Sequence, residues 1–433
     1  MRKIRTLLCS MPGIHLSGML FFIQFVSLTG FSQATPQGDQ IGSLLRNKSY
    51  FEARDLYDAK KKTLSPVEQL HLGALIDNAF NRLEASNTKI AQLRKSFPDQ
   101  LTDSVKFHLL ELQQSNFVRL HQYKAAATSI QELLDTYPLL LTDEAIADYR
   151  NTRNMWLSLS EAPRQEVIVR EQTVIQLERD KANLQNMPVR SDSVTISFIF
   201  DTGANLSTVT ESTAKRLNMR MTDSGVEVNS ITGLKVQSKV AVCPEFTIGS
   251  IVVRNAVFLV FPDSALYIPQ ISYQINGIIG FPVIEGMKEV RITRSGTFIV
   301  PMKREQPKRS NMALDFLTPI LQLGDESYTF DSGATSTMLY RHYYEKHRKA
   351  IQKRYREESL EYGGAGGMIA RPGFKIVWRP EVGGTTLRIP DVMVFPESRQ
   401  ENEVFFYGNI GQDVIQQFET MILNFESMFV RFE

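Results

Sequence analysis

The pattern of apolar and polar residues changes once along the chain. From about residue 40 to 180, glycines are few and apolar residues recur at helical spacing, as in Leu72, Ile76 and Ala79. From about Val189 onward, short runs rich in β-branched and aromatic residues alternate with glycine-containing turns. The pattern therefore predicts a multidomain protein, with an N-terminal all-α domain over residues 35–180 followed by an all-β part.

The first residues have the pattern of a secretory leader. Arg2, Lys3 and Arg5 precede an apolar run over Gly18–Gly30, and small residues follow at Ser32 and Ala34. The run is short for a membrane-spanning helix, although a retained membrane anchor is the alternative. We expect residues 1–34 to be a signal peptide, and the mature chain to be periplasmic or extracellular without a stable membrane span.

Three stretches of the helical part resemble one another. Each has a small residue three positions after its first residue and an apolar one four positions later, and a proline follows. The stretches are Tyr50-x-x-Ala53-x-x-x-Tyr57, Leu83-x-x-Ser86-x-x-x-Ile90 and Tyr123-x-x-Ala126-x-x-x-Ile130, and the prolines are Pro66, Pro98 and Pro138. This spacing resembles tetratricopeptide helical hairpins, in which a proline would end each second helix. It predicts a concave surface for a protein partner or for the chain's own β part; a plain helical bundle is the alternative.

Charge and cysteine content exclude several classes of protein. The 433 residues carry 49 basic and 47 acidic side chains, so the net charge of +2 gives no case for nucleic-acid binding. Loss of the three basic residues of the leader would change the net charge from +2 to −1. Two cysteines, Cys9 and Cys243, exclude a disulfide scaffold and a multi-cysteine metal site. Cys243 stands in a predicted strand, and we expect it to be a buried small hydrophobe.

The β part contains one motif twice. Asp201-Thr-Gly-Ala204 and Asp331-Ser-Gly-Ala334 both follow phenylalanine. Gly233 follows the first aspartate at the same spacing as Gly363 follows the second, each in a predicted hairpin turn. An Ile-Gly pair comes later in each half, at a spacing that differs by a single position. We interpret this as two lobes of one duplicated unit, residues 185–300 and 313–433, with the proline-punctuated segment 301–312 as a linker.

These paired motifs resemble the pepsin–retropepsin aspartic proteases, and the lobe size and the alanines are closer to the retropepsin branch. The resemblance implies two β-barrel lobes with a substrate cleft between them, and Asp201 and Asp331 as the catalytic dyad. It implies supporting loop roles for Thr202, Gly203, Ala204, Ser332, Gly333 and Ala334. Flap or cleft positions would be Ile231, Thr232, Gly233, Tyr362, Gly363 and Gly364, and the apolar-Gly loops would be Ile279, Gly280, Ile410 and Gly411.

The chemistry of such a pair follows from electrostatics. Two neighbouring carboxyl groups cannot both ionise readily, so they share a proton and can act as acid and base on one water molecule. Many pepsins have serine where this chain has Ala204 and Ala334. Without that hydroxyl the dyad should be less acidic, and we expect a weakly acidic pH optimum. A second departure is Asn409, which replaces an apolar residue before Ile410.

The sequence therefore predicts an exported aspartic endopeptidase that acts on peptide or protein substrates as a monomer, with neither a cofactor nor a metal. The chain has no HExxH, GxSxG or P-loop motif. One alternative is a peptide-binding module on the protease fold without turnover. Another gives the helical domain the main role, as a scaffold for a partner or as an inhibitory propeptide.

Overall fold

The computed structural model describes residues 35–229, 235–307, 309–364, 367–399 and 401–433. These residues form two units. The helical unit extends to Arg164 and includes the short segment Ala313–Phe316. The β unit comprises Gln165–Met312 and Leu317–Glu433. The predicted fold class, an all-α region followed by a bilobal β-rich region, is confirmed. The predicted signal peptide lies outside the described residues.

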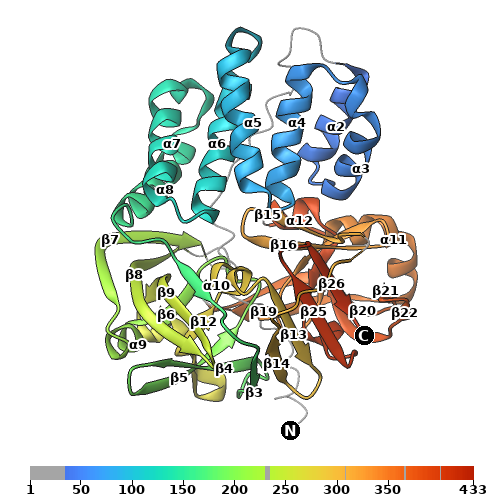
Figure 1. Ribbon diagram of the computed structural model, residues 1–433. Helices are drawn as coiled ribbons and strands as arrows, with labels where there is room; N and C mark the ends of the chain where they lie inside the picture. The colour runs from blue at the N-terminus through green and yellow to red at the C-terminus, as the bar shows by residue number, and fades with distance from the viewer. Residues whose placement is uncertain (1–34, 230–234, 308, 365–366, 400) are drawn as a thin grey trace. The chain divides into compact units, whose positions relative to one another are not determined.

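Consecutive helices of the helical unit pack against one another as hairpins (Figure 1). The helices are α2 (Pro36–Arg46), α3 (Tyr50–Lys60), α4 (Pro66–Ala79), α5 (Leu83–Ser96), α6 (Asp103–Arg119), α7 (Tyr123–Thr136) and α8 (Asp143–Ser158). Hydroxyl side chains cap the first helix of each hairpin: Thr35 caps α2, Ser65 caps α4 and Thr102 caps α6. No helix among the described residues is long and apolar enough to cross a membrane.

The sequence repeat corresponds to a structural repeat. The second helix of each hairpin begins at the first residue of a repeated stretch, at Tyr50, Leu83 and Tyr123. Two residues earlier, each turn has a residue with left-handed backbone: Lys48 (φ 54°), Asn81 (φ 60°) and His121 (φ 57°). The prolines behave differently from the prediction at one position. Pro98 and Pro138 begin short 3₁₀ turns after α5 and α7, but Pro66 is the first residue of α4. Proline fits there because its missing N–H would have no partner within the helix.

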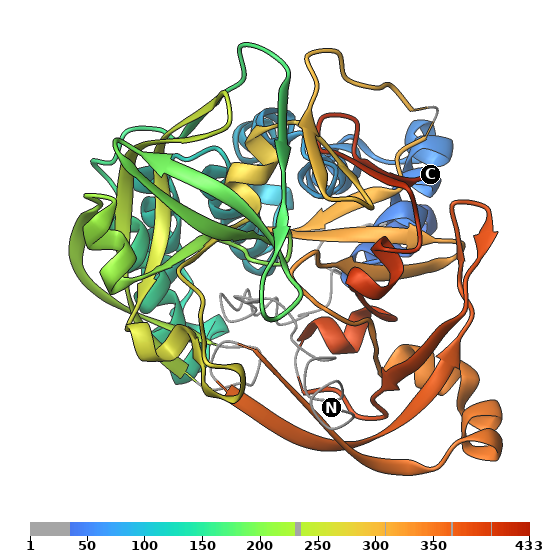
Figure 2. The same ribbon diagram turned by 90° about the horizontal axis from the view of Figure 1, so that it is seen from below.

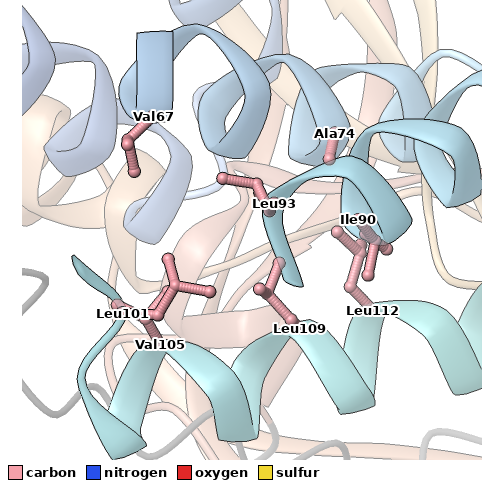
Figure 3. Packing of buried hydrophobic residues seen from close by; sticks show 8 residues of the cluster. All are labelled: Val67, Ala74, Ile90, Leu93, Leu101, Val105, Leu109 and Leu112. Carbon is pink, nitrogen blue, oxygen red and sulfur yellow. The ribbon is translucent and has the colours of Figure 1, made fainter. Parts of the chain in front are cut away.

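Small residues and branched apolar residues fill the space between the packed helices. Ser86 and Ala126 are fully buried, so the small residues of the repeat lie where helices approach closely. Figure 3 shows the core that α4, α5 and α6 build together. Its members are Val67, Ala74, Ile90, Leu93, Leu101, Val105, Leu109 and Leu112.

The predicted end of the helical domain near residue 180 is wrong, because the last helix ends at Ser158. The residues that follow form strands, and two of these strands pair with strands that come much later in the chain. β1 (Glu166–Ile168) pairs with β9 (Ile251–Phe261), β2 (Thr173–Gln176) with β14 (Thr297–Val300), and β3 (Glu178–Arg179) with β4 (Gln185–Ser191). β-branched residues favour strands here, but their partners are too distant for local periodicity to reveal.

Lobe 1 is a sheet that closes on itself. Its strand order is β1-β9-β6-β12-β5-β4-β8-β7, and an additional β8–β9 pairing closes the ring. The strands not yet given are β5 (Val194–Phe200), β6 (Ser207–Thr210), β7 (Arg220–Asn229), β8 (Lys235–Ile248) and β12 (Gly277–Ile279). Cys243 on β8 is fully buried, as expected. Two short helices, α9 (Glu211–Arg216) and α10 (Phe281–Gly286), follow β6 and β12.

Lobe 2, drawn in orange to red in Figure 2, repeats the central arrangement of lobe 1. Its order is β15-β16-β17-β24-β18-β23-β20-β19. The strands are β15 (Met312–Asp315), β16 (Thr318–Leu323), β17 (Glu326–Phe330), β18 (Met338–Leu339), β19 (Glu357–Gly364), β20 (Gly367–Trp378), β23 (Ile389–Val394) and β24 (Gly408–Ile410). The helices are α11 (Arg341–Arg354), α12 (Glu401–Phe405) and α13 (Gln412–Ile415).

The two lobes share their strand register around the motif. In lobe 1, β5 and β12 are parallel, with Phe200 opposite Ile279. In lobe 2, β17 and β24 are parallel, with Phe330 opposite Ile410. The second strand of each pair also pairs antiparallel with β6 or β18. The duplication inferred from the motif spacing is therefore present in the sheets.

A third sheet joins the lobes. Its order is β2-β14-β13-β25-β26, with β13 (Glu289–Thr293) antiparallel to β25 (Thr420–Asn424), and β26 (Phe429–Phe432) at the edge. Val290 lies opposite Leu423, and both are fully buried. The segment between β14 and β15 is Pro301–Asn311, where the linker was predicted. Backbone pairing and apolar packing thus connect the lobes.

Candidate active site

The two aspartates follow the paired parallel strands β5 and β17. Asp201 is 1% exposed and Asp331 is fully buried. The backbone N–H of Asp201 donates to the carbonyl of Ile279 at 3.1 Å, and that of Asp331 to the carbonyl of Ile410 at 3.0 Å. The Ile-Gly loops therefore hold the aspartates at the same point in each lobe.

Each carboxyl group is oriented by its own turn. The N–H groups of Gly203 and Ala204 donate to Asp201 Oδ1 at 2.8 and 3.2 Å. Those of Gly333 and Ala334 donate to Asp331 Oδ1 at 2.8 and 3.0 Å, completing the matching arrangement in lobe 2. One oxygen of each carboxyl group is thus fixed by backbone donors.

The two carboxyl groups lie against each other's turns. A Cβ added to Gly203 would lie 2.5 Å from Cγ of Asp331, and one added to Gly333 would lie 2.2 Å from Cγ of Asp201. No side chain fits at either distance, so glycine is required by the close approach of the opposite carboxyl group. The structure brings together the two aspartates that the resemblance implied as a dyad.

Hydroxyl groups cross between the lobes beneath the dyad. The Thr202 N–H donates to Ser332 Oγ, and the Ser332 N–H donates to Thr202 Oγ1, both at 3.0 Å. Thr202 Oγ1 donates to the Phe330 carbonyl at 3.1 Å, and Ser332 Oγ donates to the Phe200 carbonyl at 3.2 Å. All four polar groups are satisfied across the lobe boundary, which fixes the aspartates relative to one another.

The glycines of the Ile-Gly loops pack on the aspartate turns. A Cβ on Gly280 would lie 2.6 Å from the carbonyl oxygen of Ala204, and one on Gly411 would lie 2.9 Å from that of Ala334. The same carbonyls accept hydrogen bonds from the residues that follow these glycines, Phe281 and Gln412, at 2.8 Å. Ala204 and Ala334 are fully buried, and their backbone atoms carry these contacts.

Burial is the main influence on the acidity of the pair. It raises the pKa of Asp201 well above its ordinary value, and the neighbouring Asp331 raises that pKa further by its charge and by a side-chain hydrogen bond. The N–H groups of Gly203 and Ala204 oppose this rise in the pKa of Asp201. Because ionisation of either carboxyl group opposes ionisation of the other, the arrangement favours one proton shared by the pair.

The predicted flap residues have different outcomes. Ile231, Thr232 and Gly233 lie outside the described residues. Gly363 and Gly364 lie at the end of the β19–β20 hairpin, opposite Met368 and Gly367. The Tyr362 side chain was expected at the cleft, but it packs in a buried cluster of lobe 2 with Tyr340, Leu360 and Phe395. Its hydroxyl accepts a 3.2 Å hydrogen bond from Arg371, because a buried phenol requires a polar partner.

Sequence reasoning missed a set of polar contacts in lobe 2. Asn409 Nδ2 donates to Asp331 Oδ2 at 3.3 Å, and Gln412 Nε2 donates to the Ser332 carbonyl at 2.8 Å. The sequence offered one signal, Asn409 in place of an apolar residue. That substitution identified an unusual position but did not indicate that its partner is Asp331. Among the described residues, no three His, Cys, Asp or Glu side chains are grouped in a way that could hold a metal ion.

A duplicated β fold that brings two buried aspartates together defines an aspartic-protease-like site. Residues 187–283, which contain Asp201 and most of lobe 1, match the family model described as aspartyl protease. The predicted resemblance to aspartic proteases is thereby confirmed. No curated protein matches the chain.

The solved structures that are similar to the chain include the following two. Basic 7S globulin from soybean is 11% identical with a TM-score of 0.39, and the match covers 61% of this chain and 95% of that one. A retropepsin-like aspartic protease from Rickettsia conorii is 20% identical with a TM-score of 0.20, and the match covers 31% of this chain and 90% of that one.

Proposed function

We propose that this chain is an exported aspartic endopeptidase. The observation that supports the proposal most directly is the reciprocal approach of the dyad, in which each buried carboxyl group lies against the glycine of the opposite turn. This geometry suits two carboxyl groups that share one proton and one water molecule. Because both aspartates belong to one chain, the proposed enzyme acts as a monomer and needs no cofactor.

In the proposed reaction, a water molecule binds between Asp201 and Asp331. The ionised carboxylate takes a proton from the water as its oxygen attacks the peptide carbonyl carbon, while the protonated carboxyl group donates to the carbonyl oxygen. The tetrahedral diol then collapses, the amine nitrogen receives a proton, and the C–N bond breaks. The dyad ends with one shared proton, as it began.

Peptide-library digestion by the mature chain, residues 35–433, tests this function. We expect cleavage that pepstatin inhibits and that falls at least about 100-fold in Asp201→Asn and Asp331→Asn. Asp325→Asn is the matched control, since its side chain is 81% exposed in lobe 2. Undiminished hydrolysis in either dyad variant would refute the mechanism. Tight peptide binding without cleavage at any pH would favour the alternative, a peptide-binding module.

The proposed export depends on the leader pattern of residues 1–34. Cleavage after Ala34 predicts that the exported protein begins at Thr35, which intact-mass measurement would detect. An exported protein that retains the mass of the whole chain would contradict cleavage and favour a retained anchor.

For the helical unit we propose a role as a scaffold that binds a protein partner or regulates the protease. Its repeated hairpins are the supporting feature, since stacked helical pairs present extended surfaces for binding. Comparing the peptidase activity of residues 35–433 with that of 165–433 separates the roles. A more active short form would indicate autoinhibition, whereas equal activity would favour partner binding.

A further inference from the structure

The two aspartates of the dyad have different surroundings. In lobe 1, the residues that pair just before the motif are Ile199 and Ile278. In lobe 2, the residues at the same register are Thr329 and Asn409. All four side chains are buried, so an apolar pair near Asp201 corresponds to a polar pair near Asp331.

Asn409 has its orientation fixed by two hydrogen bonds. Its Oδ1 accepts from the Thr329 hydroxyl at 2.6 Å, and its Nδ2 donates to Asp331 Oδ2 at 3.3 Å. Since a carboxamide accepts only through oxygen and donates only through nitrogen, the Thr329 contact turns the amide N–H groups toward Asp331. Thr329 Oγ1 also lies 3.3 Å from the Gly408 carbonyl, but the shorter contact takes its single proton.

Thr329 and Asn409 thus form a buried series of donors directed at Asp331, and the members of such a series strengthen one another in a low-dielectric interior. The side chain of Tyr340 lies near these donors. Burial raises the pKa of Tyr340 well above its ordinary value, and the charge of Glu403 raises that pKa further, whereas the interaction with Thr329 lowers the pKa of Tyr340. Because the rise dominates, the phenol keeps its proton.

Among the described residues, the titratable groups that interact with Asp331 include Asp201 from lobe 1 and Tyr340 from lobe 2. Tyr340 in turn faces Glu403, which forms a 2.9 Å ion pair with Arg371. Both members of that ion pair are buried, at 6% and 2% exposure. The polar network around Asp331 is therefore held in the core of lobe 2.

We infer that Asn409 is a positioning residue that makes the dyad asymmetric, so that in the free enzyme Asp331 holds the negative charge and Asp201 holds the shared proton. The inference rests on the proposed peptidase function for its catalytic meaning. Asp331 is then the base that takes the proton of the attacking water, and Asp201 is the acid that donates to the substrate carbonyl. A donor to the ionised form stabilises that form, which assigns the charge to the aspartate that Asn409 contacts.

The test compares Asn409→Ile, which copies lobe 1, with Ile278→Val, a small packing change at the matching position. In Asn409→Ile the acidic limb of the kcat/KM–pH profile should move up by about 0.5–1 pH unit, because the Asp331 carboxylate loses one donor. Thr329→Val should move the limb in the same direction by a smaller amount, whereas Thr329→Ser, which keeps the hydroxyl, should not move it. Unmoved limbs in Asn409→Ile and Thr329→Val, or an equal shift in Ile278→Val, would overturn the inference.

A titration without turnover separates this inference from the proposed function. In protein labelled with ¹³C at the aspartate carboxyl carbons, Asp201→Asn and Asp331→Asn would assign the dyad signals. We expect the Asp331 signal to begin its change at a lower pH than the Asp201 signal. The Asn409→Ile substitution should reduce the difference between these two pH values, here called the gap. If Thr329→Val is used because Asn409→Ile does not fold, it should narrow the gap too. A gap of opposite sign, or one unchanged by these variants, refutes the asymmetry, whereas absent hydrolysis with the expected gap refutes only the peptidase.

Discussion

Thr202 and Ser332 each accept a hydrogen bond from the other's backbone N–H, at the same distance of 3.0 Å. Each hydroxyl also donates to a carbonyl of the opposite lobe. A single hydroxyl therefore satisfies two buried backbone groups across the lobe boundary, and its loss leaves both without a partner.

Thr202→Val should lower the free energy of unfolding by about 2–4 kcal/mol, since valine keeps the shape but leaves the Ser332 N–H and the Phe330 carbonyl unsatisfied. Urea-induced unfolding measures this change. The matched control is Thr195→Val at an exposed position of β5, where we expect a change within about 0.5 kcal/mol. Similar losses in both variants would mean that the crossed hydrogen bonds contribute little to stability.

The raised pKa of Asp201 makes stability depend on pH with a definite sign. A carboxyl group whose pKa is raised on folding contributes stability that is fully present below its unfolded pKa and is lost as pH rises through the folded pKa. Asp201→Asn removes this loss, so its Tm should exceed that of the wild type by an amount that grows from pH 3 to pH 7. Thermal unfolding at several pH values measures the difference, with Asp325→Asn as control. A Tm difference that stays constant or shrinks over this range would contradict burial as the dominant influence on the pKa of Asp201.

The sequence was most informative where chemistry is local. The Asp-Thr-Gly and Asp-Ser-Gly turns and the repeated helical stretches that became α3, α5 and α7 were predicted, because each depends on residues close together in the chain. The strands after Ser158 were not, since β1 pairs with β9 and β2 with β14, far along the chain. The Asn409–Asp331 contact also depends on the parallel register of β17 and β24, which no local pattern specifies.

Ala126 is fully buried on α7, at the small position of the helical repeat. Ala126→Leu should destabilise the helical unit by about 1–3 kcal/mol, because three added carbons force neighbouring helices apart. Thr128→Leu places the same side chain on the exposed side of α7 and is the matched control. Loss of helical circular dichroism on urea titration reports the effect. Equal midpoints for both variants would show that this position tolerates bulk and would remove the packing reason for the repeat.

Cys243 is buried on β8, and burial raises the pKa of its thiol to about 12. The reactive thiolate is therefore scarce at neutral pH, and access to the sulfur is blocked. Iodoacetamide at pH 8 should leave the folded mature protein unlabelled over an hour and label it once in urea, as mass spectrometry would detect. Rapid labelling without denaturant would contradict the burial of this strand.

The strands β1 to β3 place the start of the β unit at Gln165, well before the boundary that the sequence predicted. β2 is the edge strand of the sheet that joins the lobes, where it pairs with β14 and its fully buried Phe298. A fragment of residues 185–433 lacks this strand and loses the buried Leu177 as well.

We therefore expect residues 165–433 to unfold cooperatively at a higher urea concentration than residues 185–433, with a difference of at least about 2–3 kcal/mol from the loss of Leu177 burial and edge pairing. Ile175→Ala within the longer fragment is a milder test of the same strand and should lie between the two. Equal midpoints would mean that the strands after Ser158 add no stability. A β unit that starts near residue 185 would then describe the folding unit better than one that starts at Gln165.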